Sequence, residues 1–279
     1  MAEITAAAVG KLREMTGAGL MECKKALTES NGDLPLAGEI LRKKGVVSAA
    51  NKGSREAKEG VIVQFVQPGA RLGILVEVNC ETDFVARNES FKAFCDDVAR
   101  KLATNPHTDL ETDRVAAVAK IGENIKISRH ARLEVTGNGM IAAYIHTGAK
   151  VGVLVEVNAG QEATVGREEF KQLVRDITLQ IAAAHPIAVR REEIDPAIVA
   201  KEKEIAAEQV KNKPPQAITK IVEGKLEKFF QTCCLVDQGF VKKNSEISVK
   251  EHIGSVGKQL GDEISVRRFL RFQVGEVGA

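Results

Sequence analysis

The chain has 279 residues, which is enough for one large domain or for two or three smaller ones. Its 40 Lys and Arg residues against 38 Asp and Glu residues give a net charge of +2, far from the strongly basic surface of a nucleic-acid binder. Aromatic residues make up only 4%, so the predicted core depends on Val, Ile, Leu and Ala. Because no stretch of about 18 uncharged apolar residues occurs, no membrane-spanning helix is predicted.

The five cysteines are odd in number, and no two have the two-residue gap of a zinc knuckle or redox motif. Adjacent Cys233 and Cys234 would close a strained ring, which favours free thiols in a reducing compartment. The first residues lack the basic head and apolar stretch of a secretory signal. We therefore expect a cytoplasmic protein.

Residues 1–45 are predicted to form a compact module of three helices. Thr5 is expected to cap the first helix, with Met15 on its inner face. A glycine-rich turn then leads into a second helix that begins at Leu20 and Met21. These two apolar side chains either form an exposed docking surface or complete the small core, and the sequence leaves both possibilities open.

The middle of the chain contains an internal repeat. Residues 60–92 align without a gap on residues 139–171, and residues 75–79 and 154–158 both read Leu-Val-Glu-Val-Asn. Each copy has two β-branched runs joined by a turn, followed by an amphipathic helix, which Asn88 is expected to cap in the first copy. The pattern predicts an α+β fold with two related units, in each of which a helix covers a small antiparallel sheet.

The repeat sets the predicted domain boundaries. We expect a linker over residues 46–59, which are rich in Lys, Ala and Gly. A first core subdomain is expected over residues 60–138 and a second over residues 139–279. Within the second, charged helical stretches predict a helical hairpin over about residues 194–230.

The break in this hairpin is predicted at Lys213-Pro214-Pro215, because proline cannot continue a helix. The hairpin either meets another protein or packs only on itself. After it, alternating apolar residues predict strands over residues 235–242 and 264–274.

The two copies diverge between the second strand and the helix, where residues 80–87 stand against residues 159–166. Phe84 lies in this loop, and the second copy shows that the fold unit does not need a Phe there. A large apolar residue in such a loop suggests contact with another molecule. The alternative is a core residue that packs against a neighbouring domain. We expect the segment from Glu81 to Val85 to press into a partner protein.

No catalytic arrangement is recognisable in the sequence. It contains no phosphate-binding loop and no dinucleotide fingerprint, and its five histidines lack metal-ligand spacing. The adjacent acids Asp96 and Asp97 point to different faces of a predicted helix. We therefore expect neither enzymatic activity nor a metal or cofactor.

Two longer segments carry a resemblance to a known family. Residues 12–27 read Leu-Arg-Glu-Met-Thr-Gly-Ala-Gly-Leu-Met-Glu-Cys-Lys-Lys-Ala-Leu, and residues 78–86 read Val-Asn-Cys-Glu-Thr-Asp-Phe-Val-Ala. Together with residues 120–125 and 271–276, they resemble the bacterial elongation factor Ts family, the guanine-nucleotide exchange factors of elongation factor Tu. The resemblance runs in order over essentially the whole chain. It implies a ubiquitin-associated-like N-terminal domain, a core of two related subdomains and a helical hairpin.

The resemblance also implies a function and a contact surface. The implied function is to bind elongation factor Tu with its GDP and to distort the nucleotide and magnesium site, so that GDP leaves and GTP can enter. No direct contact with nucleic acid or membrane is implied. The implied contact residues are Thr82, Asp83, Phe84, Val85, Leu20, Met21, Ile121 and His146, with a further contact in the hairpin.

One departure from the family pattern is visible, and three other interpretations compete with the one that the family implies. Where family members often have Gln-Pro-Phe, this chain has Gln238-Gly239-Phe240, which leaves the local geometry open. The other interpretations are an RNA-associated protein, an enzyme with an unrecognised site and a purely structural subunit. The near-neutral charge and the scarcity of aromatic residues argue against the first.

Overall fold

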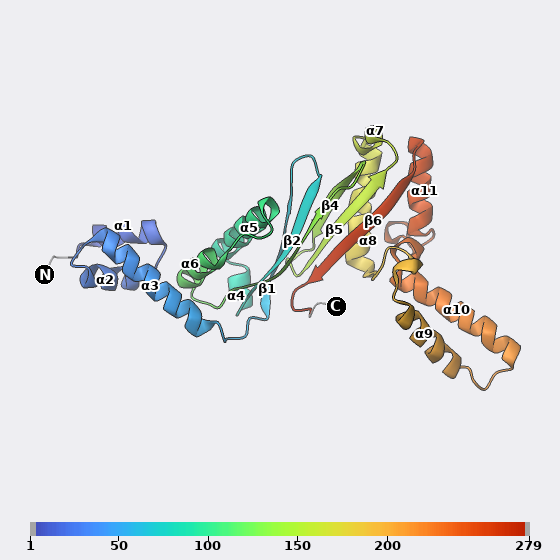
Figure 1. The fold of residues 1–279 in the computed structure, drawn as a ribbon, viewed down its shortest axis with the longest axis horizontal. Helices are drawn as coiled ribbons and strands as arrows, with labels where there is room; N and C mark the ends of the chain where they lie inside the picture. Colours follow the sequence, from blue (N-terminus) through green and yellow to red (C-terminus); the bar gives the residue numbers. More distant parts are fainter. Residues whose placement is uncertain (1–3, 277–279) are drawn as a thin grey trace. The chain divides into compact units, whose positions relative to one another are not determined.

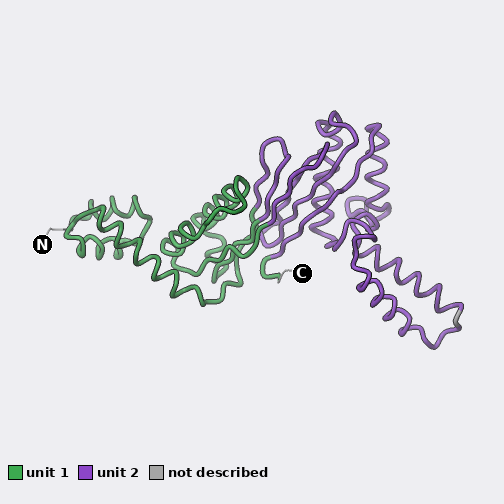
Figure 2. Tube along the Cα trace, in the orientation of Figure 1, with its two compact units in different colours: residues 1–63, 76–130, 274–279 green, residues 64–75, 131–273 purple. Residues whose placement is uncertain are grey.

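The computed structural model describes residues 4–276. They form an α+β fold, as predicted, in which N-terminal helices precede two three-stranded sheets with their helices (Figure 1). Two compact units are distinguished in Figure 2. The first contains the chain up to residue 63, residues 76–130 and the chain from residue 274, and the second contains residues 64–75 and 131–273. No helix in the described range is long and apolar enough to cross a membrane.

The N-terminal module consists of α1 (Ala6–Thr16), α2 (Leu20–Glu29) and α3 (Leu34–Lys52). The predicted cap is confirmed, because the Thr5 side chain accepts a hydrogen bond from the Ala8 N–H. The core of the module is formed by Val9, Leu12, Cys23, Ala26, Leu27 and Ala37. The inner position predicted for Met15 is wrong, since its side chain is 62% exposed. Thr16 faces α2 instead, with its Oγ1 4.0 Å from the Cys23 Sγ.

Helix α3 is longer than the sequence indicated. It continues to Lys52, so the linker expected over residues 46–59 is wrong for its first half. The reason is tertiary packing against α6 (Glu111–Ile121). Ala49 is buried, and a Cβ placed on Gly45 would lie 3.2 Å from the Ala119 Cβ. Small side chains that look like a linker in the sequence therefore let two helices approach each other closely.

The two sheets have the same topology. In each sheet the three strands lie in sequence order, and the second sheet is antiparallel throughout. The first is formed by β1 (Glu59–Val66), β2 (Leu72–Cys80) and β3 (Lys126–Glu134). The second is formed by β4 (Gly139–Ile145), β5 (Val151–Ala159) and β6 (Ile264–Gln273). The predicted strand over residues 264–274 is thereby confirmed.

The shared residues of the repeat have shared structural roles. Glu77 is buried on β2 and accepts a 2.7 Å hydrogen bond from the Arg129 Nε on β3. Glu156 is buried on β5 and accepts one of the same length from the Arg268 Nε on β6. A buried carboxylate needs such a partner, because its desolvation is costly. The identity of residues 75–79 and 154–158 therefore reflects a requirement of the fold.

The helices extend the repeat beyond the segment found in the sequence. The first copy continues with α4 (Asp83–Ala86), α5 (Glu89–Thr104) and α6, and the second with α7 (Glu162–Val165), α8 (Glu168–Ala184) and α11 (Val249–Leu260). Helices α6 and α11 both end at a glycine in the left-handed region, Gly122 with φ 90° and Gly261 with φ 66°. Strands β3 and β6 follow them, so α11 and β6 are the second-copy counterparts of α6 and β3.

The second copy contains a long insertion between α8 and α11. It includes α9 (Pro196–Glu208) and α10 (Pro215–Cys233), which pack on each other as the predicted helical hairpin. The strand predicted over residues 235–242 is wrong, because this segment forms two 3-10 turns, Leu235–Asp237 and Val241–Lys243. The Gln238 side chain donates hydrogen bonds to the carbonyls of Ala184 and Thr232, which holds the chain in this irregular path.

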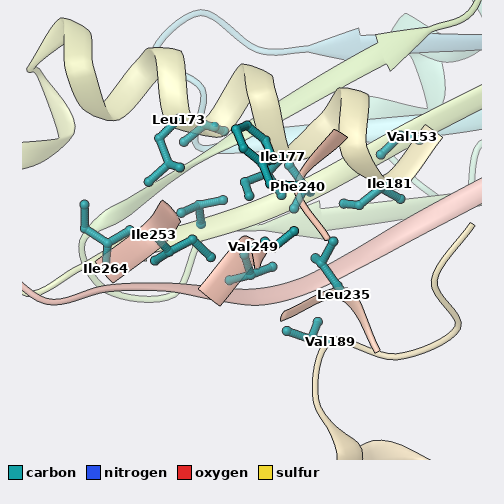
Figure 3. Packing of buried hydrophobic residues seen from close by; sticks show 14 of the residues in the cluster. Val153, Leu173, Ile177, Ile181, Val189, Leu235, Phe240, Val249, Ile253 and Ile264 are labelled. Carbon is teal, nitrogen blue, oxygen red and sulfur yellow. The ribbon is translucent and has the colours of Figure 1, made fainter. Parts of the chain in front are cut away.

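The core of the second unit lies between its sheet and helices α8 and α11 (Figure 3). Leu235 and Phe240 enter it from the irregular segment. The other residues labelled in Figure 3 are Val153, Leu173, Ile177, Ile181, Val189, Val249, Ile253 and Ile264.

Candidate functional site

The loop between β2 and α5 exposes an aromatic ring. Phe84 is the second residue of the short helix α4, and it is 81% exposed. Phe84 is therefore not part of the core of its own unit. The corresponding position in α7 is Ala163, which is also exposed. Because both copies form the same four-residue helix, the backbone does not depend on the aromatic side chain.

The backbone of this loop is held by Glu123, the residue after the glycine that ends α6. Its Oε2 accepts hydrogen bonds from the N–H groups of Glu81 and Thr82, both at 3.0 Å, and its Oε1 accepts one from the Thr82 hydroxyl at 2.6 Å. In return, the Glu81 Oε1 accepts the Asn124 N–H at 2.6 Å. We call these four hydrogen bonds of Glu81 and Glu123 the carboxylate clasp. Hydrogen bonds to ionised acceptors are stronger than neutral ones, so the clasp fixes the start of α4 firmly.

The residues next to Phe84 have separate roles. Thr82 caps α4, because its Oγ1 accepts the Val85 N–H at 3.3 Å, and Val85 itself is half-buried. Asp83 is not the cap: its carboxylate lies 2.9 Å from the Arg87 guanidinium, and the two side chains are 45% and 78% exposed. Such exposed pairs contribute little to stability. Asp83 therefore keeps acceptor capacity that a partner can use.

The second copy holds its loop in the same way. Asp262 follows Gly261 as Glu123 follows Gly122, and its Oδ2 accepts the Gln161 N–H at 3.0 Å. The hydrogen bond from Thr164, together with backbone donors, holds the pKa of the Asp262 carboxyl below its usual range. Sequence reasoning did not identify Glu123 as part of the site. The signal was present, because Gly-Glu-Asn-Ile and Gly-Asp-Glu-Ile extend the repeat at residues 122–125 and 261–264.

Two other predicted contact segments belong to the same unit as Phe84. Ile121, which is half-buried, ends α6 two residues before Glu123. A Cβ placed on Gly17 would lie 3.2 Å from the Lys120 Cδ, so the turn between α1 and α2 lies against the end of α6. The α1–α2 turn thus lies against the end of α6, and the residue that follows this helix end, Glu123, holds the Phe84 loop.

The apolar residues beside that turn are on the surface. Leu20 and Met21, which begin α2, are 51% and 65% exposed, so they do not complete the core of the module. Met15, which precedes the turn, is a third exposed apolar residue there. No separate signal in the sequence marked Met15, because its spacing also fits an inner face.

His146 belongs to the second unit, where it lies in the turn between β4 and β5. It is exposed, and its Nδ1 is 3.0 Å from the Tyr144 hydroxyl. The hairpin belongs to this unit as well, with Ile198 and Ile205 exposed on α9. These residues remain separate candidates for partner contact.

Neither a metal-binding cluster nor a disulfide is found among the described residues. Within residues 4–276, no group of three or more His, Cys, Asp or Glu side chains could hold a metal ion. The five cysteines are buried free thiols. What the loop offers is a fixed backbone that carries an exposed ring and a carboxylate, which is suited to insertion into a protein surface.

Comparison with known proteins gives a consistent result. Residues 81–276 match the family model described as elongation factor TS. Curated relatives named elongation factor Ts include one from Symbiobacterium thermophilum, 44% identical over 99% of this chain and 93% of its own length. One from a Nostoc species is 40% identical over 99% of this chain and 94% of its own length. One from Lawsonia intracellularis is 39% identical, with 98% and 99% covered.

Proposed function

Because the chain belongs to the elongation factor Ts family, we propose that it binds elongation factor Tu and promotes the release of its bound GDP. The observation that carries this proposal is the exposed ring of Phe84 on a loop whose backbone is fixed. An exposed ring on a rigid support loses little conformational freedom when it binds, so more of its burial free energy is available for distorting a partner.

In the proposed mechanism, the factor and the nucleotide stabilise different conformations of the nucleotide site of elongation factor Tu. Proteins hold nucleotide phosphates with backbone N–H groups and a magnesium ion. Phe84 enters beside this site and displaces the groups that hold the phosphates and the ion. Because coupling between two ligands is reciprocal, the nucleotide weakens the binding of the factor by the same ratio. The exchange cycle follows, since GTP entering the emptied site releases the factor.

The free energies show that Phe84 does not act alone. Burying one Phe side chain contributes about 1.5–3 kcal/mol. A thousandfold loosening of the nucleotide needs about 4 kcal/mol. The remainder comes from Asp83 and from the other contacts that we propose, at Leu20, Met21, Ile121 and His146 and in the hairpin.

Asp83 has a distinct part in this proposal. Its carboxylate accepts hydrogen bonds from backbone N–H groups of the partner, at a helix N-terminus where negative charge is favoured. The chain itself performs no bond chemistry and needs no cofactor. Its place is the cytoplasm, where translation takes place.

The test is the rate at which labelled GDP leaves purified elongation factor Tu, followed by stopped-flow fluorescence. Phe84→Ala is expected to slow the release roughly ten- to hundredfold, which corresponds to the burial of one ring. Val241→Ala is the matched control, because it removes an exposed apolar side chain from the second unit. An unchanged release rate with Phe84→Ala would refute the role given to this residue.

A further inference from the structure

We propose that Glu123 is a positioning residue for the exchange reaction, because it holds the Phe84 loop in the conformation that enters the partner. This inference rests on the proposed function and adds a residue outside the contact surface. Glu123 acts through the backbone of Glu81 and Thr82, and it has no need to touch the partner.

The ring of Phe84 cannot position itself. With 81% of its surface exposed, Phe84 has almost no packing that would fix it. Helix α4 has only four residues, and so short a helix is not stable without outside support. The orientation of the ring therefore depends on the anchors of its backbone, and Glu123 supplies three hydrogen bonds to the two residues that precede α4.

The carboxylate clasp also connects the Phe84 loop to other predicted contact segments. Glu123 follows the end of α6, which carries Ile121 and lies against the α1–α2 turn through Lys120. The neighbouring Asn124 is fully buried, and its side-chain Nδ2 donates to the Arg55 carbonyl at 2.8 Å, just beyond α3. Glu123 thus fixes the Phe84 loop against the part of the first unit that carries the predicted contacts Leu20, Met21 and Ile121.

The repeat distinguishes the role of the anchoring carboxylate from the role of the exposed ring. Asp262 anchors the α7 loop as Glu123 anchors the α4 loop, but the residue of α7 that corresponds to Phe84 is Ala163. The anchor is therefore a property of the fold unit, and the ring is an addition of the first copy. The second copy supplies a control, because removing Asp262 loosens a loop that has no exposed ring.

Without Glu123, we expect a smaller fraction of molecules to have the Phe84 loop in the conformation that enters the partner. Apparent affinity falls in proportion to that fraction, whereas the bound complex can still order the loop. Glu123→Ala should therefore raise the concentration of factor that gives half-maximal GDP release, by about tenfold or more, since one hydrogen bond to a charged group is worth that factor. The maximal release rate should change less than twofold, because Phe84 is still present.

The experiment measures GDP release from elongation factor Tu as a function of factor concentration, for Glu123→Ala, Glu123→Gln and Asp262→Ala. Glu123→Gln keeps an acceptor oxygen for the two N–H groups and should restore part of the affinity. Asp262→Ala should leave both the half-saturating concentration and the maximal rate unchanged. If Glu123→Ala does not fold, as judged by circular dichroism, Glu123→Gln carries the test with a smaller shift.

The combination with Phe84→Ala distinguishes this inference from the proposed function. In the Phe84→Ala background, Glu123→Ala should have a clearly smaller further effect than in the unsubstituted protein, because the ring is absent and only Asp83 is left on this helix to position. A full effect in that background, or an equal effect of Asp262→Ala, would mean that Glu123 has only a structural role. If Phe84→Ala itself has no effect, the proposed function of the loop fails first. If Phe84→Ala slows release and Glu123→Ala leaves affinity intact, only the positioning role is overturned.

Discussion

The exposure of Phe84 and the order of the backbone beneath it have different causes. The backbone conformation recurs in the second copy, where α7 forms without any aromatic residue. The ring adds no packing to its own unit, so it contributes little to folding and leaves apolar area in water. A residue that the fold neither needs nor covers is available for a partner. Its neighbours differ in this respect, since Thr82 and Val85 are partly occupied by the cap of α4.

Asp83 provides a prediction at the same scale, because its carboxylate pairs with the exposed Arg87. If the carboxylate serves the partner, Asp83→Ala should weaken binding of elongation factor Tu by about tenfold, the value of one charged hydrogen bond. Arg87→Ala should change binding by less than threefold and folding stability by less than about 0.5 kcal/mol, since exposed pairs are weak. Isothermal titration calorimetry measures the binding of both variants. Equal losses would show that Asp83 acts through its pair with Arg87.

His252 predicts a dependence of stability on pH. Its ring stacks on Phe240 with centroids 4.2 Å apart, and burial lowers the pKa of the imidazole below 6.5, against an opposing effect of Asp176 and a smaller lowering by Lys242 and Lys243. The unfolded chain then binds the proton more readily than the folded one. Stability from this group is present above pH 6.5 and is lost as the pH falls through 6.5 toward the lowered pKa.

The measurement is the free energy of unfolding by urea, followed from neutral to mildly acidic pH. His252→Phe keeps a ring on Phe240 and removes the titrating group, so its stability should fall less over this range than that of the unsubstituted protein. Parallel curves for the two proteins would show that protonation of His252 is not linked to folding.

At the scale of the elements, the sequence predicted those whose signals are local. The caps Thr5 and Asn88 and the glycine turn before α2 specify where helices begin, and the structure confirms them. The predictions were wrong where contacts with residues far away in the chain determine the local structure. Helix α3 continues because Gly45 fits against α6. Helix α11 was not predicted, because Gly257 interrupts its pattern, yet a Cβ there would lie 2.8 Å from the Asp262 carbonyl oxygen.

The same distinction holds for the site. Phe84 could be identified from the sequence, because comparing two copies of one unit removes the residues that the fold requires. For Glu123, the repeat at residues 122–125 and 261–264 marks the position but not its role, since its hydrogen-bond partners Glu81 and Thr82 are 42 and 41 residues away in the chain. A carboxylate after a helix gives no local sign of which backbone it will bind.

Gly239 offers an element-scale test of the departure from the family pattern. The backbone before it tolerates a proline, because Gln238 has φ −64° and ψ 146°. A Cβ on Gly239 would, however, lie 2.5 Å from the Ser245 Cβ. Gly239→Pro should therefore cost about 1–3 kcal/mol of stability, as overpacking does.

The cost should shrink when the opposing side chain is removed. Ser245 has φ 61°, a conformation that glycine adopts freely, so Ser245→Gly is tolerated at this position. Thermal unfolding of the two single variants and the double variant gives the coupling between the sites. If Gly239→Pro is as destabilising in the Ser245→Gly background as in the unsubstituted protein, the close contact is not the reason why this chain differs from the family pattern.

At the scale of the molecule, the repeat shows what each unit needs to be complete. The first copy passes from α5 to α6 through residues 105–110 alone, whereas the second inserts the α9–α10 hairpin between α8 and α11. The root of the hairpin is fixed to its own unit. Arg191 donates hydrogen bonds to Glu227 on α10 and to Asp237 beyond it. The outer part of the hairpin is therefore an addition to a unit that is already complete.

A shortened hairpin tests this division of the molecule. Replacing residues 203–225 with a short Gly and Ser linker keeps Val199, Phe230 and the Arg191 contacts at the root. The variant should retain its helix and sheet content by circular dichroism, with a melting temperature within a few degrees of the full chain. The core of the second unit includes no residue from the removed segment, which is the reason for this expectation.

The same variant separates the hairpin from the Phe84 loop in function. If the hairpin only adds binding free energy, the shortened protein should need a higher concentration for half-maximal GDP release. Phe84→Ala should then slow release by the same factor in the shortened and the full-length protein, since independent contacts are additive. A much smaller effect of Phe84→Ala in the shortened protein would show instead that the loop acts only when the hairpin is engaged with elongation factor Tu.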